Sequence, residues 1–325
     1  MSLSLQPGES ASRPHRIPLL DVTRGLALIA MTTFHFSWDL EFFGYATAGL
    51  TSQPAFKWYA RCIAFSFLLL VGLSFALAHS NGFNRAGFLK RLAQVSGAAA
   101  LITVGTLYTT PDRFVFFGIL HQIAAASLLC VVFMRAPIWL VLLSAIAIAG
   151  LPQVFRSALF EHPFLWWTGL AIDLPLTNDY VPVFPWSGYV LFGLVLGRLA
   201  LRQGLTRNAA LTKPLSNSSA KGLAFLGKHS LVYYLVHQPL LFGLLSLVSM
   251  IAPPDRSQAF VQSCQTSCQV ENAADFCERF CSCVRDELRA KSILNEVIAG
   301  TRDVASDPEI LDTASLCTPQ AGSQP

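Results

Sequence analysis

Seven long apolar segments constrain the fold of this chain more than any other feature of its sequence. They cover about residues 19–43, 58–78, 92–108, 114–134, 137–155, 185–201 and 227–251. An α-helix of about 20 apolar residues crosses the hydrocarbon core of a bilayer, and these segments reach or approach that length. With 53% hydrophobic and 13% charged residues, the chain is also far more apolar than a soluble domain. The sequence therefore predicts an all-α integral membrane protein with a seven-helix transmembrane bundle.

The basic residues predict how this bundle is oriented, because Lys and Arg are enriched in cytoplasmic loops. The basic residues that fall on one side of the predicted bundle are Arg13, Arg16, Arg85, Lys90, Arg91, Arg135, Arg198, Arg202, Arg207, Lys213 and Lys221. We expect this side to be cytoplasmic, with the N-terminus inside and the C-terminus in the periplasm of a bacterial inner membrane. The first apolar segment is too long and too polar for a cleavable signal peptide, so we expect it to stay in the protein.

The loop 156–184 is more apolar than a free loop should be, since it contains Phe164, Leu165, Trp166 and Trp167. Tryptophan favours the membrane interface. We therefore interpret this loop as an amphipathic segment that lies at the outer surface. An eighth span is the alternative, and it would place the C-terminal tail inside.

The last part of the chain differs from the rest in charge and in cysteine content. Residues 255–325 hold 11 of the 19 acidic residues but only 6 of the 23 basic ones, and apolar runs disappear after Pro253. Six of the eight cysteines also lie there. The sequence thus predicts a cytoplasmic N-terminal segment (1–16), a membrane domain (17–252) and a cysteine-rich periplasmic helical tail (253–325).

The cysteine spacing predicts how the tail is held together. Four cysteines follow the pattern C-x3-C-x8-C-x3-C, which places two on one face of each of two antiparallel helices. The preferred pairing is Cys264–Cys281, Cys268–Cys277 and Cys283–Cys317. A metal or cluster site is the alternative, but no nearby histidine completes a zinc set. Disulfides form outside the cytosol, so the pairing agrees with a periplasmic tail, and no metal is expected.

The first apolar segment carries ionisable residues, which cost several kcal/mol in hydrocarbon unless they are paired or face water. Asp21 and Arg24 are three residues apart, and His35 and Asp39 are four apart, so each pair shares a helix face. Asp39 would orient His35 as a general base or an acyl-accepting nucleophile, whereas a merely structural buried histidine is the alternative. Arg24 suits phosphate binding, with an ion pair to Asp21 as the equal alternative.

Other polar residues fall in or beside the predicted spans. The candidates for lining a channel or an acceptor pocket are His121, Gln122, Asp179, Tyr180, Trp186, His229, Tyr233 and His237. His229, Tyr233 and His237 are spaced at i, i+4 and i+8, which places them on one helix face. Each of these residues taken alone would be structural, but histidines on three spans favour a shared polar cavity.

Three sequence blocks resemble a known family. They are LLDVTRGLALIAM with Arg16 and His35, then DYVPVFPWSGYVLFGLVLGRL at 179–199, then LGKHSLVYYLVHQPLLFG at 226–243. In this order, over about residues 16–250, they resemble bacterial members of the heparan-alpha-glucosaminide N-acetyltransferase catalytic-domain family. The resemblance implies that cytoplasmic acetyl-CoA binds near Asp21 and Arg24 and that His35 is catalytic. It also implies that Asp179, Tyr180 and Trp186 shape the outer pocket, and that the polar residues of the last span line the channel.

The function expected from these observations is a membrane acetyltransferase. It would move an acetyl group from cytoplasmic acetyl-CoA to an extracytoplasmic amino sugar, glycan or lipid-linked sugar. The alternative is a proton-coupled transporter of small solutes with an intramembrane histidine relay. The expected partners are the lipid bilayer and the acceptor, and the sequence is compatible with a homo-oligomer. Nucleic-acid binding is not expected, and neither a P-loop nor an HExxH motif occurs.

Overall fold

A computed structural model describes residues 17–47, 49–205, 215–298 and 300–322 of the chain. The predicted N-terminal segment 1–16 and residues 206–214, which follow the sixth predicted span, lie outside the described residues. Within the described ranges the regular structure is helical and contains no strand, which confirms the all-α prediction. Contacts divide the chain into two compact units, one of Met1–Thr32 with Trp58–Gln238 and one of Thr33–Lys57 with Pro239–Pro325. The predicted domain boundaries stay a prediction.

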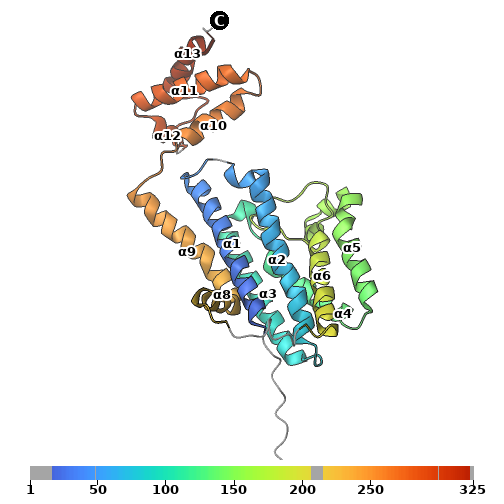
Figure 1. Cartoon of the computed structure of the whole chain (residues 1–325). Coiled ribbons are helices and arrows are strands. Elements are labelled where there is room, and N and C mark those ends of the chain that lie inside the picture. Colours follow the sequence, from blue (N-terminus) through green and yellow to red (C-terminus); the bar gives the residue numbers. More distant parts are fainter. Residues whose placement is uncertain (1–16, 48, 206–214, 299, 323–325) are drawn as a thin grey trace, which may run out of the picture. The chain divides into compact units, whose positions relative to one another are not determined.

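Each predicted apolar segment contains a helix (Figure 1). The helices are α1 (Pro18–Phe43), α2 (Pro54–Ala78), α3 (Arg85–Thr109), α4 (Ile119–Phe133), α5 (Ile138–Val154), α6 (Val183–Arg202), α8 (Ser218–Lys228) and α9 (Ser230–Ile251). The seventh predicted segment, 227–251, corresponds to α9, but its first two residues belong to the end of α8, and the turn at His229 separates the two helices. The residues of this segment on either side of His229 therefore belong to two different helices.

Four of these helices, α2, α3, α6 and α9, are long and apolar enough to cross a membrane. Helices α4 and α5 are apolar but have only 15 and 17 residues. Helix α1 has 26 residues, but Asp21, Arg24, Asp39 and Glu41 lie within it, and it is not among the four. The chain thus has the helices of a membrane protein, whereas the predicted number of seven spans is not confirmed.

The apolar loop 156–184 forms no helix that could cross the membrane. It contains two 3-10 helices, η3 (Ala158–Glu161) and η4 (Pro163–Thr168), of 4 and 6 residues. The indole N–H of Trp166 donates a hydrogen bond of 2.7 Å to the carbonyl oxygen of Glu161. No helix in this loop, all of whose residues the structure describes, is long enough to support the alternative of an eighth span.

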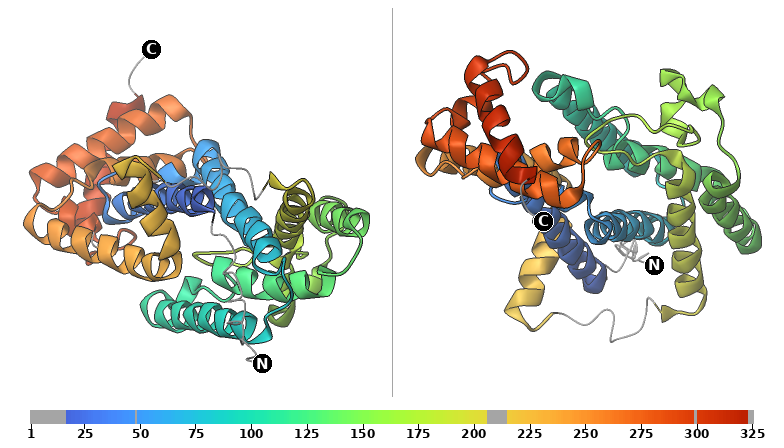
Figure 2. Two further views of the ribbon diagram at one scale, coloured as in Figure 1. Left: turned by 60° about the horizontal axis from the view of Figure 1, so that its bottom comes forward. Right: turned by 90° about the horizontal axis from the view of Figure 1, so that it is seen from above.

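Helix α6 packs along α5, and the two lie side by side in the views of Figures 1 and 2. Val190, Leu191 and Leu194 of α6 are fully or almost fully buried in the main apolar core. The glycines of this helix allow its neighbours to pack closely against it. A Cβ atom on Gly188 would lie 2.6 Å from the carbonyl oxygen of Ala145 in α5, and one on Gly193 would overlap a backbone carbonyl of α2.

The cysteine-rich part of the second unit consists of four helices. They are α10 (Ser257–Cys268), α11 (Ala274–Ala290), α12 (Leu294–Ile298) and α13 (Pro308–Gly322). Helices α10 and α11 are the predicted antiparallel pair. Helix α11 is followed by a turn with Ser292 at a φ of 58° and then by α12. Helix α13 was not predicted.

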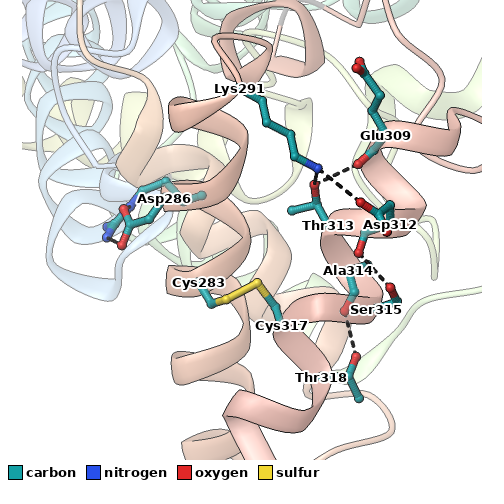
Figure 3. Close-up of a disulfide and its surroundings, with 11 residues drawn as sticks. Cys283, Asp286, Lys291, Glu309, Asp312, Thr313, Ala314, Ser315, Cys317 and Thr318 are labelled. Carbon is teal, nitrogen blue, oxygen red and sulfur yellow. Dashed lines mark hydrogen bonds and ion pairs between the residues drawn. A yellow bond between two sulfur atoms is a disulfide. The ribbon is translucent and has the colours of Figure 1, made fainter.

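All three predicted disulfides are present. Cys264–Cys281 and Cys268–Cys277 join α10 to α11, with Cα atoms 5.8 and 5.7 Å apart, and Cys283–Cys317 joins α11 to α13. Figure 3 shows this last bridge beside Lys291, whose ammonium donates to the hydroxyl of Thr313 at 2.9 Å. Leu288 and Ile310 belong to the small apolar core beneath it. Disulfides thus add to a core too small to hold four short helices firmly.

Candidate cofactor-binding cavity

A cavity of about 670 Å³ lies within the first unit. Parts of α1, α2, α3, α4 and the α8–α9 junction form its walls. Its volume falls in the range of sites that bind small molecules and cofactors. All its lining residues belong to the first unit, so its geometry is defined within one compact body.

One end of this cavity is basic. Arg24 of α1, Arg91 of α3 and Lys228 at the end of α8 line it, together with His79 and His229. His79 directly follows α2 and His229 directly follows α8, so both lie at helix ends. The Nδ1–H of His79 donates to the carbonyl oxygen of Phe75 at 2.9 Å, which leaves the Nε2 of His79 for other partners. Several positive side chains around one opening are suited to an anionic group such as a phosphate.

Two glycines bring α1 and α8 together at this basic end. A Cβ atom on Gly25 would overlap the carbonyl oxygen of Leu223, and one on Gly227 would overlap the carbonyl oxygen of Asp21. The two backbones can approach this closely only because both positions lack a side chain. This contact holds Lys228, the neighbour of Gly227, near the helical turn that carries Arg24.

Asp21 and Ser74 help to hold Arg24 in place. Its Nη1 donates to the carboxylate of Asp21 at 2.9 Å, and its Nη2 donates to the hydroxyl of Ser74, which also lines the cavity. About a quarter of its side chain stays accessible, 26%, whereas Asp21 is buried. The two alternatives for Arg24, an ion pair and an anion-binding group, are therefore compatible in one geometry.

The other end of the cavity is apolar. Phe67, Leu120 and Ile119 line it, and Tyr234 of α9 lies beside them. Phe67 and His79 are twelve positions apart along α2 and its end, which corresponds to roughly 18 Å of helix rise. The cavity is therefore long, with positive charge at one end and an apolar lining at the other.

A carboxylate from a distant loop caps α4 at this apolar end. Oδ2 of Asp179 accepts a hydrogen bond of 2.9 Å from the backbone N–H of Ile119, the first residue of α4. A Cβ atom on Gly118 would overlap this carboxylate, so the site requires glycine there. Removal of the carboxylate from water raises the pKa of Asp179, and the N–H of Ile119 offsets part of this rise.

The residues around Asp179 fix its loop to the segment that precedes α4. The backbone N–H of Val181 donates to the carbonyl oxygen of Phe117 at 3.1 Å. The phenol of Tyr180 donates to the carbonyl oxygen of Trp166 at 2.7 Å, and burial raises the pKa of this phenol to about 12. Trp186 packs against the main apolar core and against the ring of Tyr189. Asp179 and Tyr180 are thus brought together, and Trp186 follows on α6.

His121 and Gln122 lie in the first turns of α4 but do not line the cavity. Nδ1 of His121 accepts from the N–H of Gly118 at 3.2 Å, so its Nε2 carries the proton that is donated to Thr103. Gln122 is fully buried and donates to the hydroxyl of Ser187 at 2.7 Å, while its carbonyl oxygen has no partner among the described residues. Both nitrogens of His121 therefore serve to hold α4.

The break at His229 separates the three polar residues predicted for the last span. His229 lines the basic end, whereas Tyr233 and His237 do not line the cavity. The hydroxyl of Thr32 already donates to a backbone carbonyl, so Tyr233 donates to it at 2.8 Å. The ring of His237 stacks on that of Tyr233, with centroids 6.0 Å apart, and its Nδ1–H donates to a carbonyl.

His35 and Asp39 belong to the second unit, on the C-terminal half of α1. Their spacing places them on one face of the helix. Asp39 is fully buried, and His35 is half-buried. The rings of His35 and Phe34 form a T-shaped pair with their centroids 5.7 Å apart. The predicted pair therefore lies in a sheltered environment, and its catalytic role stays a prediction.

The comparison with known protein families agrees with the resemblance of the three sequence blocks. The profile of the heparan-alpha-glucosaminide N-acetyltransferase catalytic family matches residues 16–239. The chain belongs to this family. No curated protein matches it, and no solved structure does. The match covers every residue that lines the cavity and indicates a membrane acetyltransferase, whereas the transporter alternative gains no support.

Sequence reasoning missed several residues that line the cavity, among them His79. Arg91 was used only to orient the bundle, and Lys228 and Tyr234 lie unremarked inside the third resembling block. A helix drawn without the break at His229 places Tyr233 on the polar face. In the structure the neighbouring Tyr234 faces the cavity instead. The basic residue at the start of α3 was the one signal that charge patterning offered.

Proposed function

We propose that this protein transfers an acetyl group from acetyl-CoA, bound in the cavity of the first unit, to an extracytoplasmic amino sugar, glycan or lipid-linked sugar. The observation that carries this proposal is the division of the cavity into a basic and an apolar end. A CoA thioester is divided in the same way, since it joins several phosphates to a long, largely apolar arm. A family of N-acetyltransferases matches the same residues.

The donor would bind with its phosphates at Arg24, Arg91 and Lys228. A guanidinium binds phosphate oxygens through paired hydrogen bonds, and an ammonium adds a compact positive charge. Asp21 supports this site indirectly. Its carboxylate accepts a hydrogen bond of 2.9 Å from Nη1 of Arg24 and so helps to hold the Arg24 side chain at the cavity. Tight binding of phosphate is then expected at this end, and the acetyl group reaches toward the apolar end.

The basic end would face the cytoplasm, where acetyl-CoA is available. The N-terminus would lie inside and the disulfide-bonded tail in the periplasm of a bacterial inner membrane. Three disulfides support this placement, because such bonds persist in oxidising compartments. The two sides of the membrane would thus supply the two substrates.

His35, oriented by Asp39, would accept the proton of the acceptor or carry the acetyl group transiently. Asp179, Tyr180 and Trp186 would shape the acceptor pocket on the outer side. His121, Gln122, Tyr233 and His237 would hold the polar path between the two substrates. The burial of Asp39 supports its role, because a carboxylate held away from water interacts strongly with a neighbouring imidazole.

The test is acetyl transfer to D-glucosamine by the purified full-length protein in lipid nanodiscs, with labelled acetyl-CoA. We expect His35→Ala to abolish transfer while it leaves the affinity for CoA unchanged, because the variant removes a reacting group and not the phosphate site. Ser37→Ala, two residues further along α1, is the matched control and should transfer at the wild-type rate. Full activity of His35→Ala would refute the role of His35, and an inactive wild type that binds no CoA would refute the proposed function.

A further inference from the structure

Tyr234 is the polar side chain at the apolar end of the cavity that the fold does not use. It lines the cavity beside Leu120, and its ring packs against the apolar cluster formed by α3 and α4, which includes Val95. Its hydroxyl makes no hydrogen bond to the residues that the structure describes. A phenol whose ring is fixed by packing presents its hydroxyl in one direction at little entropic cost.

The neighbouring phenol provides a contrast. Tyr233 donates its hydrogen bond to Thr32, so its hydroxyl is satisfied within the bundle. Buried phenols usually find such a partner. For Tyr234 the cavity itself is the remaining place for one. Tyr234 packs against the apolar cluster that contains Leu120, the second residue of α4, which places the phenol near the first turn of that helix.

We propose that the hydroxyl of Tyr234 donates a hydrogen bond to the carbonyl oxygen of the acetyl thioester and stabilises the negative charge that develops there. The inference rests on the proposed function, since it assigns the orientation of the donor in the same cavity. The phosphates lie at the end formed by Arg24 and Lys228, and the acetyl group lies at the end formed by Tyr234 and Leu120. In this orientation the reacting carbon is farthest from the cytoplasmic opening.

The chemical step balances without any further reactant. The nitrogen of the acceptor amine attacks the carbonyl carbon, the C–N bond forms and the carbonyl oxygen becomes an oxyanion. The C–S bond then breaks, the carbonyl is restored, and the proton that the general base His35 takes from the amine passes to the departing CoA sulfur. Tyr234 donates a hydrogen bond throughout and transfers no proton. A donor fixed in advance is worth more here than in water, because the apolar lining excludes solvent.

The decisive variant is Tyr234→Phe, which removes the hydroxyl and keeps the ring. We expect its kcat for acetyl transfer to D-glucosamine to fall by about 10²-fold. Its affinity for CoA, which lacks the acetyl carbonyl, should equal that of the wild type. Tyr189→Phe is the matched control, because Tyr189 is a half-buried phenol of α6 that does not line the cavity. This control should transfer at the wild-type rate.

A spectroscopic measurement on the wild type makes the test independent of how the variant folds. The infrared stretch of acetyl-CoA labelled with ¹³C at the acetyl carbonyl should shift to lower frequency on binding, and Tyr234→Phe should abolish the shift. No shift in the wild type, or transfer by Tyr234→Phe at the wild-type rate, would overturn the inference. The proposed function would still stand in that case if the wild type binds CoA. Absence of CoA binding in the wild type would overturn both.

Discussion

Asp179 illustrates how one side chain of this protein can serve a structural role that a sequence pattern suggests as a functional one. The pattern placed it at an acceptor pocket, and the structure shows it as the cap of α4 through Ile119. An acceptor pocket and a cap are not exclusive, since one carboxylate oxygen makes the bond described. The requirement for glycine at position 118 was not predictable, because the contact joins residues 61 positions apart.

The raised pKa of Asp179 predicts a pH dependence of stability. A carboxyl group whose pKa is higher in the folded state than in the unfolded state binds more protons when folded, so the free energy of unfolding decreases as pH rises above about 4. Asp179→Asn keeps an oxygen that accepts from Ile119 and removes the ionisation. We expect this variant to lose that part of the decrease, measured as the unfolding temperature in detergent at several pH values.

The wild type supplies the reference in this experiment, because all other groups titrate in both proteins. Only the difference between the two pH curves reports on Asp179. Two parallel curves would show that the carboxyl group has the same pKa in the folded and unfolded states. The cap would then be accessible to water, contrary to the burial that raises the pKa.

Helices were the elements that apolar patterning predicted best. Long apolar runs identify α2, α3, α6 and α9, because a continuous apolar surface has no alternative in a bilayer. The break between α8 and α9 was not predictable, since no Pro or Gly stands at His229. Helix α13 was missed because its polar sequence carries no apolar run. In the structure its Ile310 and Cys317 belong to the same small apolar core as Leu288.

The close approach of α1 and α8 is an element-scale feature with a direct test. Gly227→Ala would place a methyl group on the backbone of Asp21 and separate the helices that carry Arg24 and Lys228. We expect this variant to lose stability and to bind acetyl-CoA more weakly. Gly222→Ala is the matched control in the same helix, because no atom lies within 4 Å of the added methyl group.

The control has an expected gain. Alanine is favoured over glycine by about 1 kcal/mol in an exposed helix, so Gly222→Ala should unfold at the same temperature as the wild type or slightly above it. Calorimetry and acetyl-CoA titration of both variants provide the comparison. Equal stability and equal affinity of Gly227→Ala and Gly222→Ala would contradict the close packing of α1 on α8.

At the scale of the whole molecule, the sequence contained two separate kinds of information. The charge and cysteine distributions predicted a disulfide-bonded helical tail, and all three bridges were correct. Two of them follow from the local helical spacing of four cysteines, and Cys283–Cys317 is the pair that remains. The cavity depends instead on residues from six helices, and spacing within one helix does not reveal such a set. The family predicted from the three sequence blocks agrees with the family match, which covers residues 16–239.

The most direct test of the central claim is the stabilisation of the purified protein by acetyl-CoA. A ligand that binds only the folded state raises its stability by about 2.7 kcal/mol at a hundredfold excess over Kd. We expect this stabilisation in the wild type and in Lys90→Ala, whose side chain does not line the cavity, and its loss in Arg91→Ala, the next residue. Equal stabilisation of both variants, or none in the wild type in lipid nanodiscs, would contradict acetyl-CoA binding at the basic end of this cavity.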